Sequence, residues 1–224
     1  MRTNLTPACL IIALASVSAS ADIINPAQLV TSPDGPNANL QQLIYDAGYT
    51  SSVGFLESAG DQTSDEWFKM CRGAESMRWE VSWQRAGHAP HHKLGYFMPD
   101  NPADITWVIG GSSSGLPSVA DLSISGLFGL AFYSGDNGGV NSTIYRSVTS
   151  MNPDGKDHMV SLMIRDAEGY LRSCGRILSW EDLWNLGDKD YNDFGVVAMT
   201  GMVPTPGALA ALGLAGVIAG RRRR

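Results

Sequence analysis

Charged side chains and long apolar runs are both scarce in this sequence of 224 residues, and each shortage excludes a class of protein. Charged residues make up only 17% and hydrophobic residues 44%, which argues against a disordered acidic chain, a coiled coil or a charge-rich helical bundle. No apolar run reaches the roughly 20 residues that span a bilayer as a helix. Instead, 25 Gly and 11 Pro indicate a turn-rich globular domain, and the chain length suits a single one.

Basic residues are also in short supply. The chain carries 16 basic and 22 acidic residues, a formal net charge of -6. Five of the basic residues, Arg2 and the four of residues 221–224, lie at the two ends, so the sequence between them has 11 basic against 22 acidic residues, a net charge of -11. Such a body attracts cations and repels polyanions, so nucleic acid is not an expected partner.

The first 21 residues have the pattern of a secretory signal peptide. An apolar run of about ten residues over positions 8–17 follows a short polar start, and the small residues Ala19 and Ala21 suit a signal peptidase. We therefore expect cleavage before Asp22 and export of the remainder. A buried first strand or helix is the alternative.

The carboxy-terminal end has three parts: a proline-bracketed start, an apolar stretch over 207–220 and a basic end. As a helix, the apolar stretch extends about 21 Å, and snorkelling arginines with local thinning bring it closer to the thickness of a bilayer. The arginines are expected on the cytoplasmic side; a terminal core helix is the alternative. The residues concerned are Val203, Pro204, Thr205, Pro206, Arg221, Arg222, Arg223 and Arg224.

This tail resembles the PEP-CTERM protein-sorting motif of Gram-negative bacteria, although Thr205 stands where the family usually has Glu. The resemblance implies a precursor held transiently in the inner membrane and cut there by an exosortase. It implies further that the product reaches the cell surface or extracellular matrix, in association with exopolysaccharide or biofilm.

Cysteine is rare, with 3 in the chain. Cys9 would leave with the signal peptide, so Cys71 and Cys174 remain. In an oxidising compartment they most simply form one disulfide, and two separately buried thiols are the alternative. A structural zinc site is disfavoured, because neither cysteine has a second ligand at close spacing.

Period-two patterns dominate the middle of the chain. Over residues 78–84, apolar side chains alternate with polar ones, which predicts a strand with Trp79, Val81 and Trp83 on one face. Clusters of Gly, Pro, Asn, Asp and Ser separate further short apolar runs, over 94–98, 105–109, 127–133, 160–165 and 194–199. We predict an all-β fold, an antiparallel β-sandwich or jelly-roll-like domain. Before it, one short helix is predicted over 40–47, with Asn37 or Asn39 as its cap.

A loop rich in carboxylates, residues 181–193, directly precedes the last of these apolar runs. Like charges at this spacing repel, so a fold that gathers them needs a cation, and Ca²⁺ accepts six to eight oxygen ligands from flexible loops. The spacing resembles the first half of an EF-hand loop, but the following Gly and the distal Glu are missing, so an EF-hand is rejected. A turn in which Asp and Asn satisfy backbone donors is the alternative. The candidate ligands are Glu181, Asp182, Asp188, Asp190, Asn192 and Asp193.

A second candidate ligand set lies earlier, at Asn152, Asp154 and Asp157. Asn-Pro and Asp-Gly pairs form turns without any metal, so an ordinary turn is the alternative there.

Both acidic segments resemble a bacterial extracellular domain catalogued as domain of unknown function 4114. The resemblance rests on the apolar strand and Glu-Asp-Leu at 177–183, on Gly-Asp-Lys-Asp-Tyr-Asn-Asp at 187–193, and on the segment 152–158. It extends over about 94–199. The expected organisation is a signal peptide (1–21), an amino-terminal part (22–93), this β domain (94–202) and the sorting signal (203–224). No established catalytic activity comes with the family.

We therefore expect a non-catalytic exported protein rather than an enzyme. A carbohydrate-binding module is the first alternative, because Trp180 and Trp184 border the acidic loop and aromatic faces stack on sugar rings. A metal-dependent hydrolase using His88 and His92 is the second, although Pro90 between them argues against the helical spacing that such a pair needs.

Overall fold

The structure is a computed structural model that describes residues 32, 35, 38–49, 67–71, 74–135, 142–165, 171–199 and 202–204. These residues belong to one compact unit, residues 21–206. The predicted signal peptide lies outside the described residues, and so does the predicted sorting signal apart from Val203 and Pro204. Within the described part of the chain, no helix is long and apolar enough to cross a membrane.

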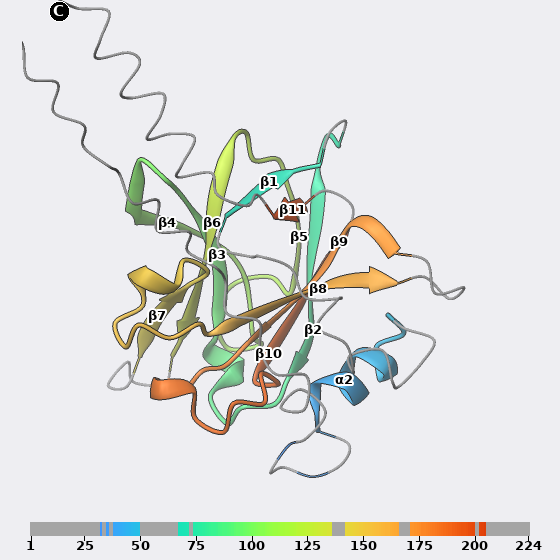
Figure 1. The fold of residues 1–224 in the computed structure, drawn as a ribbon, viewed down its shortest axis with the longest axis vertical. Helices are drawn as coiled ribbons and strands as arrows, with labels where there is room; N and C mark the ends of the chain where they lie inside the picture. The colour runs from blue at the N-terminus through green and yellow to red at the C-terminus, as the bar shows by residue number, and fades with distance from the viewer. Residues whose placement is uncertain are drawn as a thin grey trace, which may run out of the picture. The chain divides into compact units, whose positions relative to one another are not determined.

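The described strands form two sheets in which every pairing is antiparallel (Figure 1), which confirms an all-β fold. The first, called the β6 sheet, has the order β11 (Met202–Pro204), β1 (Phe68–Met70), β6 (Leu127–Ser134), β3 (Lys93–Met98) and β4 (Asn101–Gly110), and β7 (Thr143–Arg146) pairs with β6. The second, called the β10 sheet, has the order β5 (Val119–Leu122), β2 (Met77–Gln84), β10 (Phe194–Met199), β9 (Leu171–Trp180) and β8 (Met159–Arg165).

The main core lies between these two sheets. Successive side chains of a strand point to opposite faces, so every second residue of each strand enters the interior. Phe132 of β6 stacks on Trp180 of β9, with ring centroids 5.1 Å apart, and lies 5.5 Å from the ring of Phe194 of β10. These aromatic contacts across the interior hold the sheets face to face, and Trp180 and Phe194 also end and begin the two strands that flank the acidic loop.

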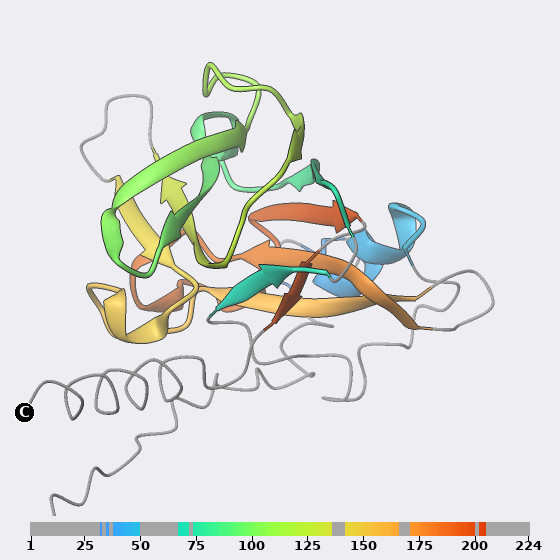
Figure 2. The ribbon, with the colours of Figure 1, turned by 90° about the horizontal axis from the view of Figure 1, so that it is seen from above.

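Helix α2 (Leu40–Asp46) covers the outer face of the β10 sheet, as Figure 2 shows from above. Its residues Leu40, Leu43 and Ile44 pack against Val160, Val197 and their neighbours. The side chain of Asn39 accepts a hydrogen bond from the backbone N–H of Gln42, which caps the first turn. The predicted helix and one of its two predicted caps are therefore confirmed.

Strand β2 does not keep its tryptophans on one face, which corrects the expectation from strict alternation. In the pairing with β10, Val81 and Trp83 face consecutive residues, so Ser82 is an extra residue and forms a β-bulge. One extra residue reverses the side-chain alternation. Trp79 therefore packs in the core between the sheets, whereas Trp83 packs on the outer face beside α2.

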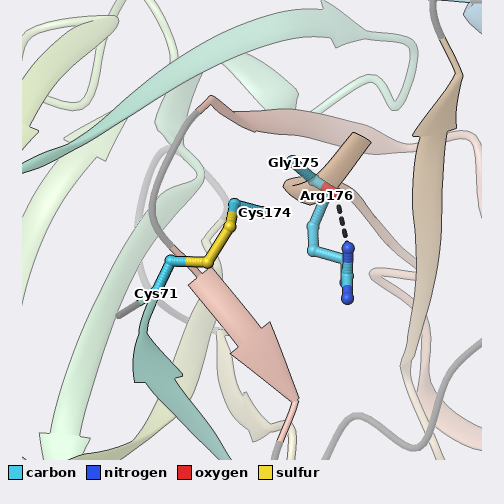
Figure 3. Close-up of a disulfide and its surroundings, with 4 residues drawn as sticks. All are labelled: Cys71, Cys174, Gly175 and Arg176. Atoms are coloured by element: carbon cyan, nitrogen blue, oxygen red, sulfur yellow. Dashed lines mark hydrogen bonds between the residues drawn. A yellow bond between two sulfur atoms is a disulfide. The ribbon is translucent and has the colours of Figure 1, made fainter. Parts of the chain in front are cut away.

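A disulfide joins Cys71 and Cys174, as predicted, and Figure 3 shows it beside the buried Arg176. Cys71 directly follows β1 of the β6 sheet, and Cys174 lies in β9 of the β10 sheet. Their Cα atoms are 6.0 Å apart, while 103 positions separate them in sequence. The bond therefore links the two sheets covalently.

Candidate metal centre in the loop between β9 and β10

The acidic loop, residues 181–193, connects two neighbouring strands of the β10 sheet. Trp180 at the end of β9 pairs with Phe194 at the start of β10, so the two ends of the loop lie side by side. Inside the loop, the short 3₁₀ helix η5 (Trp184–Leu186) is kinked at Asn185. The non-glycine residues with left-handed backbone in the described structure all lie in this loop: Asn185, Leu186, Lys189 and Tyr191. This tight coiling returns the second half of the loop onto the first.

The coiling brings five predicted ligands together. Their carboxylates form two overlapping groups of three, and in each group the ligand oxygens lie within 4.8 Å of one another. Glu181 belongs to both groups. We call Glu181, Asp188 and Asp190 the outer triplet, because Asp188 is exposed, and Glu181, Asp182 and Asp193 the inner triplet.

Glu181 is the central residue of the cluster and is 0% exposed. Its backbone N–H donates to the carbonyl oxygen of His158 at 3.0 Å, which fixes the main chain. Both of its carboxylate oxygens are buried without a hydrogen-bond donor. A Cβ atom on Gly187 would lie 2.7 Å from Glu181 Oε1, so glycine at 187 leaves the space that this carboxylate occupies.

Burial and mutual repulsion dominate the electrostatics of the cluster. Burial, followed by the negative charges of Asp193 and Asp188, raises the pKa of Glu181 to about 10. Burial, followed by the charge of Asp182, raises the pKa of Asp193 to about 8. When both carboxylates are ionised, Asp193 and Glu181 offer each other no hydrogen-bond donor, whereas a proton kept on Glu181 is shared with Asp193. A cation at this position would remove the cost of ionising both.

Asp182 and Asp193 are held in place by specific contacts. The backbone N–H of Asp182 donates to Asp193 Oδ2 at 2.9 Å. Asp182 Oδ2 lies 3.2 Å from Nε2 of His92, a buried ring packed edge-on against Phe132 and Phe194. The histidine run of the sequence therefore supplies one neighbour of the acidic loop. His88, in contrast, is exposed.

Asn192, also a predicted ligand, ties the loop to the segment before α2. Its Nδ2 donates to the carbonyl oxygen of Ala38 at 2.7 Å and to Asp190 Oδ2 at 2.6 Å. Its backbone N–H donates to Asp190 Oδ1 at 3.2 Å. Asn192 thus positions one carboxylate of the outer triplet and joins it to the segment before α2.

Of the earlier predicted ligands, Asn152, Asp154 and Asp157, the two aspartates belong to neither triplet. The amide of Asn152 accepts from the N–H of Arg146 and donates to the carbonyl oxygens of Arg146 and Lys156. Asp154 Oδ1 accepts from the N–H of Lys156, and Asp157 Oδ1 accepts from the N–H of Met159. The structure uses these side chains to build the turn, and their role as metal ligands stays a prediction.

His158 connects that turn to the acidic loop, and sequence reasoning did not single it out. Its buried ring donates from Nδ1 to the carbonyl oxygen of Glu181 at 2.9 Å, and its Nε2 lies 2.9 Å from Asp154 Oδ2. The ring also stacks on Tyr145, with centroids 3.5 Å apart. Asp154 Oδ2 accepts in addition from the N–H of Asn185 inside the loop. A lone histidine in a turn carries no sequence signal for such a role.

The two tryptophans predicted to stack on sugars have opposite environments. Trp180 is 0% exposed and stacks on Phe132, so the prediction does not hold for it. Trp184 is 54% exposed, and Leu183 beside it is 53% exposed. Only the second tryptophan offers a face to a ligand.

A separate hollow, a surface pocket of about 340 Å³, lies beside the turn of the β3–β4 hairpin. Its apolar part comes from Tyr96, Phe97, Met98 and Ile124. Its polar part comes from Asp100, Asn101, Asp104, Thr106, Ser123 and Ser125. A pocket with an aromatic wall and several polar side chains suits a small polar ligand.

Comparison with known proteins connects the candidate centre to a family. No curated protein and no solved structure matches the chain. Residues 130–201 match the family model described as "Domain of unknown function (DUF4114)", whereas the expected resemblance begins at residue 94. The matched part starts in β6 and ends just after β10. The acidic loop and the turn that His158 ties to it thus lie in a DUF4114 domain, at residues 130–201 of this chain.

Proposed function

We propose that this chain is a non-catalytic, exported cell-surface or matrix module whose acidic loop binds Ca²⁺. The observation that carries the proposal is Glu181, whose two buried carboxylate oxygens have no donor and lie within 4.8 Å of the oxygens of other carboxylates. An unpaired buried carboxylate is costly, and a bound cation removes that cost.

The ligand chemistry favours calcium over transition metals. Each triplet consists of carboxylate oxygens, the donors that hard cations prefer, and contains neither cysteine nor histidine. The loop is irregular and partly exposed, which suits the flexible coordination of Ca²⁺ better than the strict octahedron of Mg²⁺. Because Glu181 and Asp190 are buried, the ion would stabilise the loop rather than activate a substrate.

Export and processing belong to the same proposal. A disulfide between Cys71 and Cys174 supports an oxidising compartment. The signal-like start implies signal peptidase, and the PEP-CTERM-like tail implies exosortase, a transient stay in the inner membrane and release to the surface or matrix of a Gram-negative bacterium. Association with extracellular polysaccharide is the role that this sorting route implies.

Thermal unfolding of the folded chain with and without calcium tests the proposal. Calcium at about 100 times its dissociation constant adds about 2.7 kcal/mol to the free energy of unfolding, so the melting temperature should rise by several degrees. Magnesium at the same concentration should have a smaller effect. An identical melting temperature in calcium and in metal-free buffer would refute calcium binding.

Two variants make the test specific. Glu181→Gln keeps the shape of the side chain but removes its charge, so the calcium-induced shift should disappear while the metal-free protein stays folded. Asp104→Asn is the matched control, because Asp104 is an exposed acidic residue outside both triplets. It should keep the full shift.

Carbohydrate binding is the second candidate function, and the hollow beside Tyr96 favours it together with the exposed Trp184. A glycan array probed with the native chain, Asn101→Ala and Trp184→Ala separates the two surfaces. Loss of binding in Asn101→Ala points to the hollow, and loss in Trp184→Ala points to the acidic loop. An array without any bound glycan would remove this candidate.

A further inference from the structure

The five carboxylates of the acidic loop form two groups, and this arrangement bears on the number of ions that the loop can hold. The outer triplet and the inner triplet are two groups, not one, and only Glu181 belongs to both. The outer triplet draws Asp188 and Asp190 from the middle of the loop, and the inner triplet draws Asp182 and Asp193 from its two ends.

Calcium–oxygen distances limit what one ion can reach. Ca²⁺ binds oxygen at about 2.3–2.6 Å, so two ligand oxygens on one ion are at most about 5 Å apart. Each triplet meets this limit, since its oxygens lie within 4.8 Å of one another. The five carboxylates as a set do not form one group of that size. One ion therefore fits each triplet better than one ion fits all five.

Glu181 is suited to serve both ions. Both of its oxygens are buried and neither has a hydrogen-bond donor, so each is available to a cation. Its backbone is fixed on both sides by hydrogen bonds with His158, and the missing side chain of Gly187 leaves room for Oε1. A carboxylate held in this way can bind one ion through each oxygen.

The charge of the cluster also favours two ions over one. With all five carboxylates ionised, as metal binding requires, the cluster carries a charge of -5, of which one Ca²⁺ would leave -3 and two would leave -1. Asp182 and Asp190 are 8% and 1% exposed, so water screens their charges poorly.

We propose that the acidic loop holds two calcium ions bridged by the carboxylate of Glu181, one in the outer triplet and one in the inner triplet. The inference rests on the proposed function and adds its stoichiometry and the division of the ligands. The outer ion has exposed Asp188 as a ligand and completes its coordination with water. The inner ion is bound between the two ends of the loop and holds β9 and β10 together at that point.

Counting calcium ions on the folded chain tests this inference. Native mass spectrometry, with isothermal titration calorimetry in parallel, should give two ions per native chain. Asp188→Asn and Asp193→Asn should each retain one ion, and the double variant should retain none. Glu181→Gln should weaken both ions, whereas Asp104→Asn should retain both.

Every result separates this inference from the proposed function. One ion on the native chain, lost in both Asp188→Asn and Asp193→Asn, would mean a single shared site and would overturn the two-ion arrangement while calcium binding stands. No ion on the native chain would overturn both. Asp188 is exposed, so its amide variant should fold, and near-ultraviolet circular dichroism checks that each variant keeps its tertiary packing.

Discussion

Among single residues, Gly195 of β10 is a position where the fold leaves no room for a side chain. The ring of Trp83 lies across it, and a Cβ atom there would be 1.9 Å from Trp83 Cε2. That ring is 7% exposed and packs beneath α2, so it has little space in which to move. We expect Gly195→Ala to lower the free energy of unfolding by about 1–3 kcal/mol, measured by equilibrium unfolding in urea.

Gly87→Ala is the matched control for that substitution. A Cβ atom on Gly87 would have no other atom within 4 Å, because this residue borders open space. Its substitution should change the stability by no more than about 0.5 kcal/mol. Equal effects of the two substitutions would mean that the packing of Trp83 on Gly195 does not matter to the fold.

At the scale of elements, the sequence predicted most of the longer strands. The six apolar runs all form strands, β2, β3, β4, β6, β8 and β10, because short apolar runs rich in aromatic and β-branched residues between turn residues are typical of strands, and the run over 78–84 also alternates. Short strands such as β1 and β7, with three and four residues, give too few repeats for a periodicity to show. The bulge at Ser82 could not be predicted from the sequence either, because it depends on how β2 pairs with β10.

For the candidate site too, the sequence predicted some features of the acidic loop and not others. The residue types and their spacing were sufficient to predict that Glu181, Asp188 and Asp193 converge. The roles of Asn152 and Asn192 were not predictable, because an amide side chain that ligates a metal and one that closes a turn look alike in sequence. His92 and His158 reach the loop through tertiary contacts, from the residue before β3 and from the 152–158 turn, which no local pattern encodes.

The disulfide is the covalent link between two elements, the end of β1 and strand β9. Closing a loop of about 100 residues removes entropy from the unfolded chain, which is worth about 4 kcal/mol in the chain-entropy model. We therefore expect reduction to lower the free energy of unfolding by about that amount, measured by urea unfolding with and without dithiothreitol.

A variant with both Cys71→Ser and Cys174→Ser is the control for this experiment. It should match the reduced native chain in stability and should not respond to dithiothreitol. If the reductant destabilised the variant as well, its effect would not come from the disulfide. Unchanged stability of the reduced native chain would show that the packing between the sheets is sufficient without the bond.

For the whole molecule, the cluster makes the stability of the metal-free chain depend on pH. The pKa of Glu181 is about 10 in the fold against 4.5 as its ordinary value, and that of Asp193 is about 8 against 3.8. Between these values the folded state keeps protons that the unfolded state has released. The unfolded state then binds fewer protons, so the free energy of unfolding falls as pH rises.

We therefore expect the melting temperature of the metal-free chain to fall between about pH 5 and about pH 8, the range in which both raised pKa values act. Saturating calcium should reduce or reverse this fall, because it binds the ionised carboxylates and so favours the folded state more as pH rises. Glu181→Gln removes one of the two groups, and its metal-free melting temperature should depend less on pH than that of the native chain. The difference between the two curves reports Glu181 together with its interaction with Asp193. A native chain that becomes more stable over this range without metal, with a curve parallel to that of Glu181→Gln, would mean that the carboxylate is not buried unpaired and would remove the main support for the calcium site.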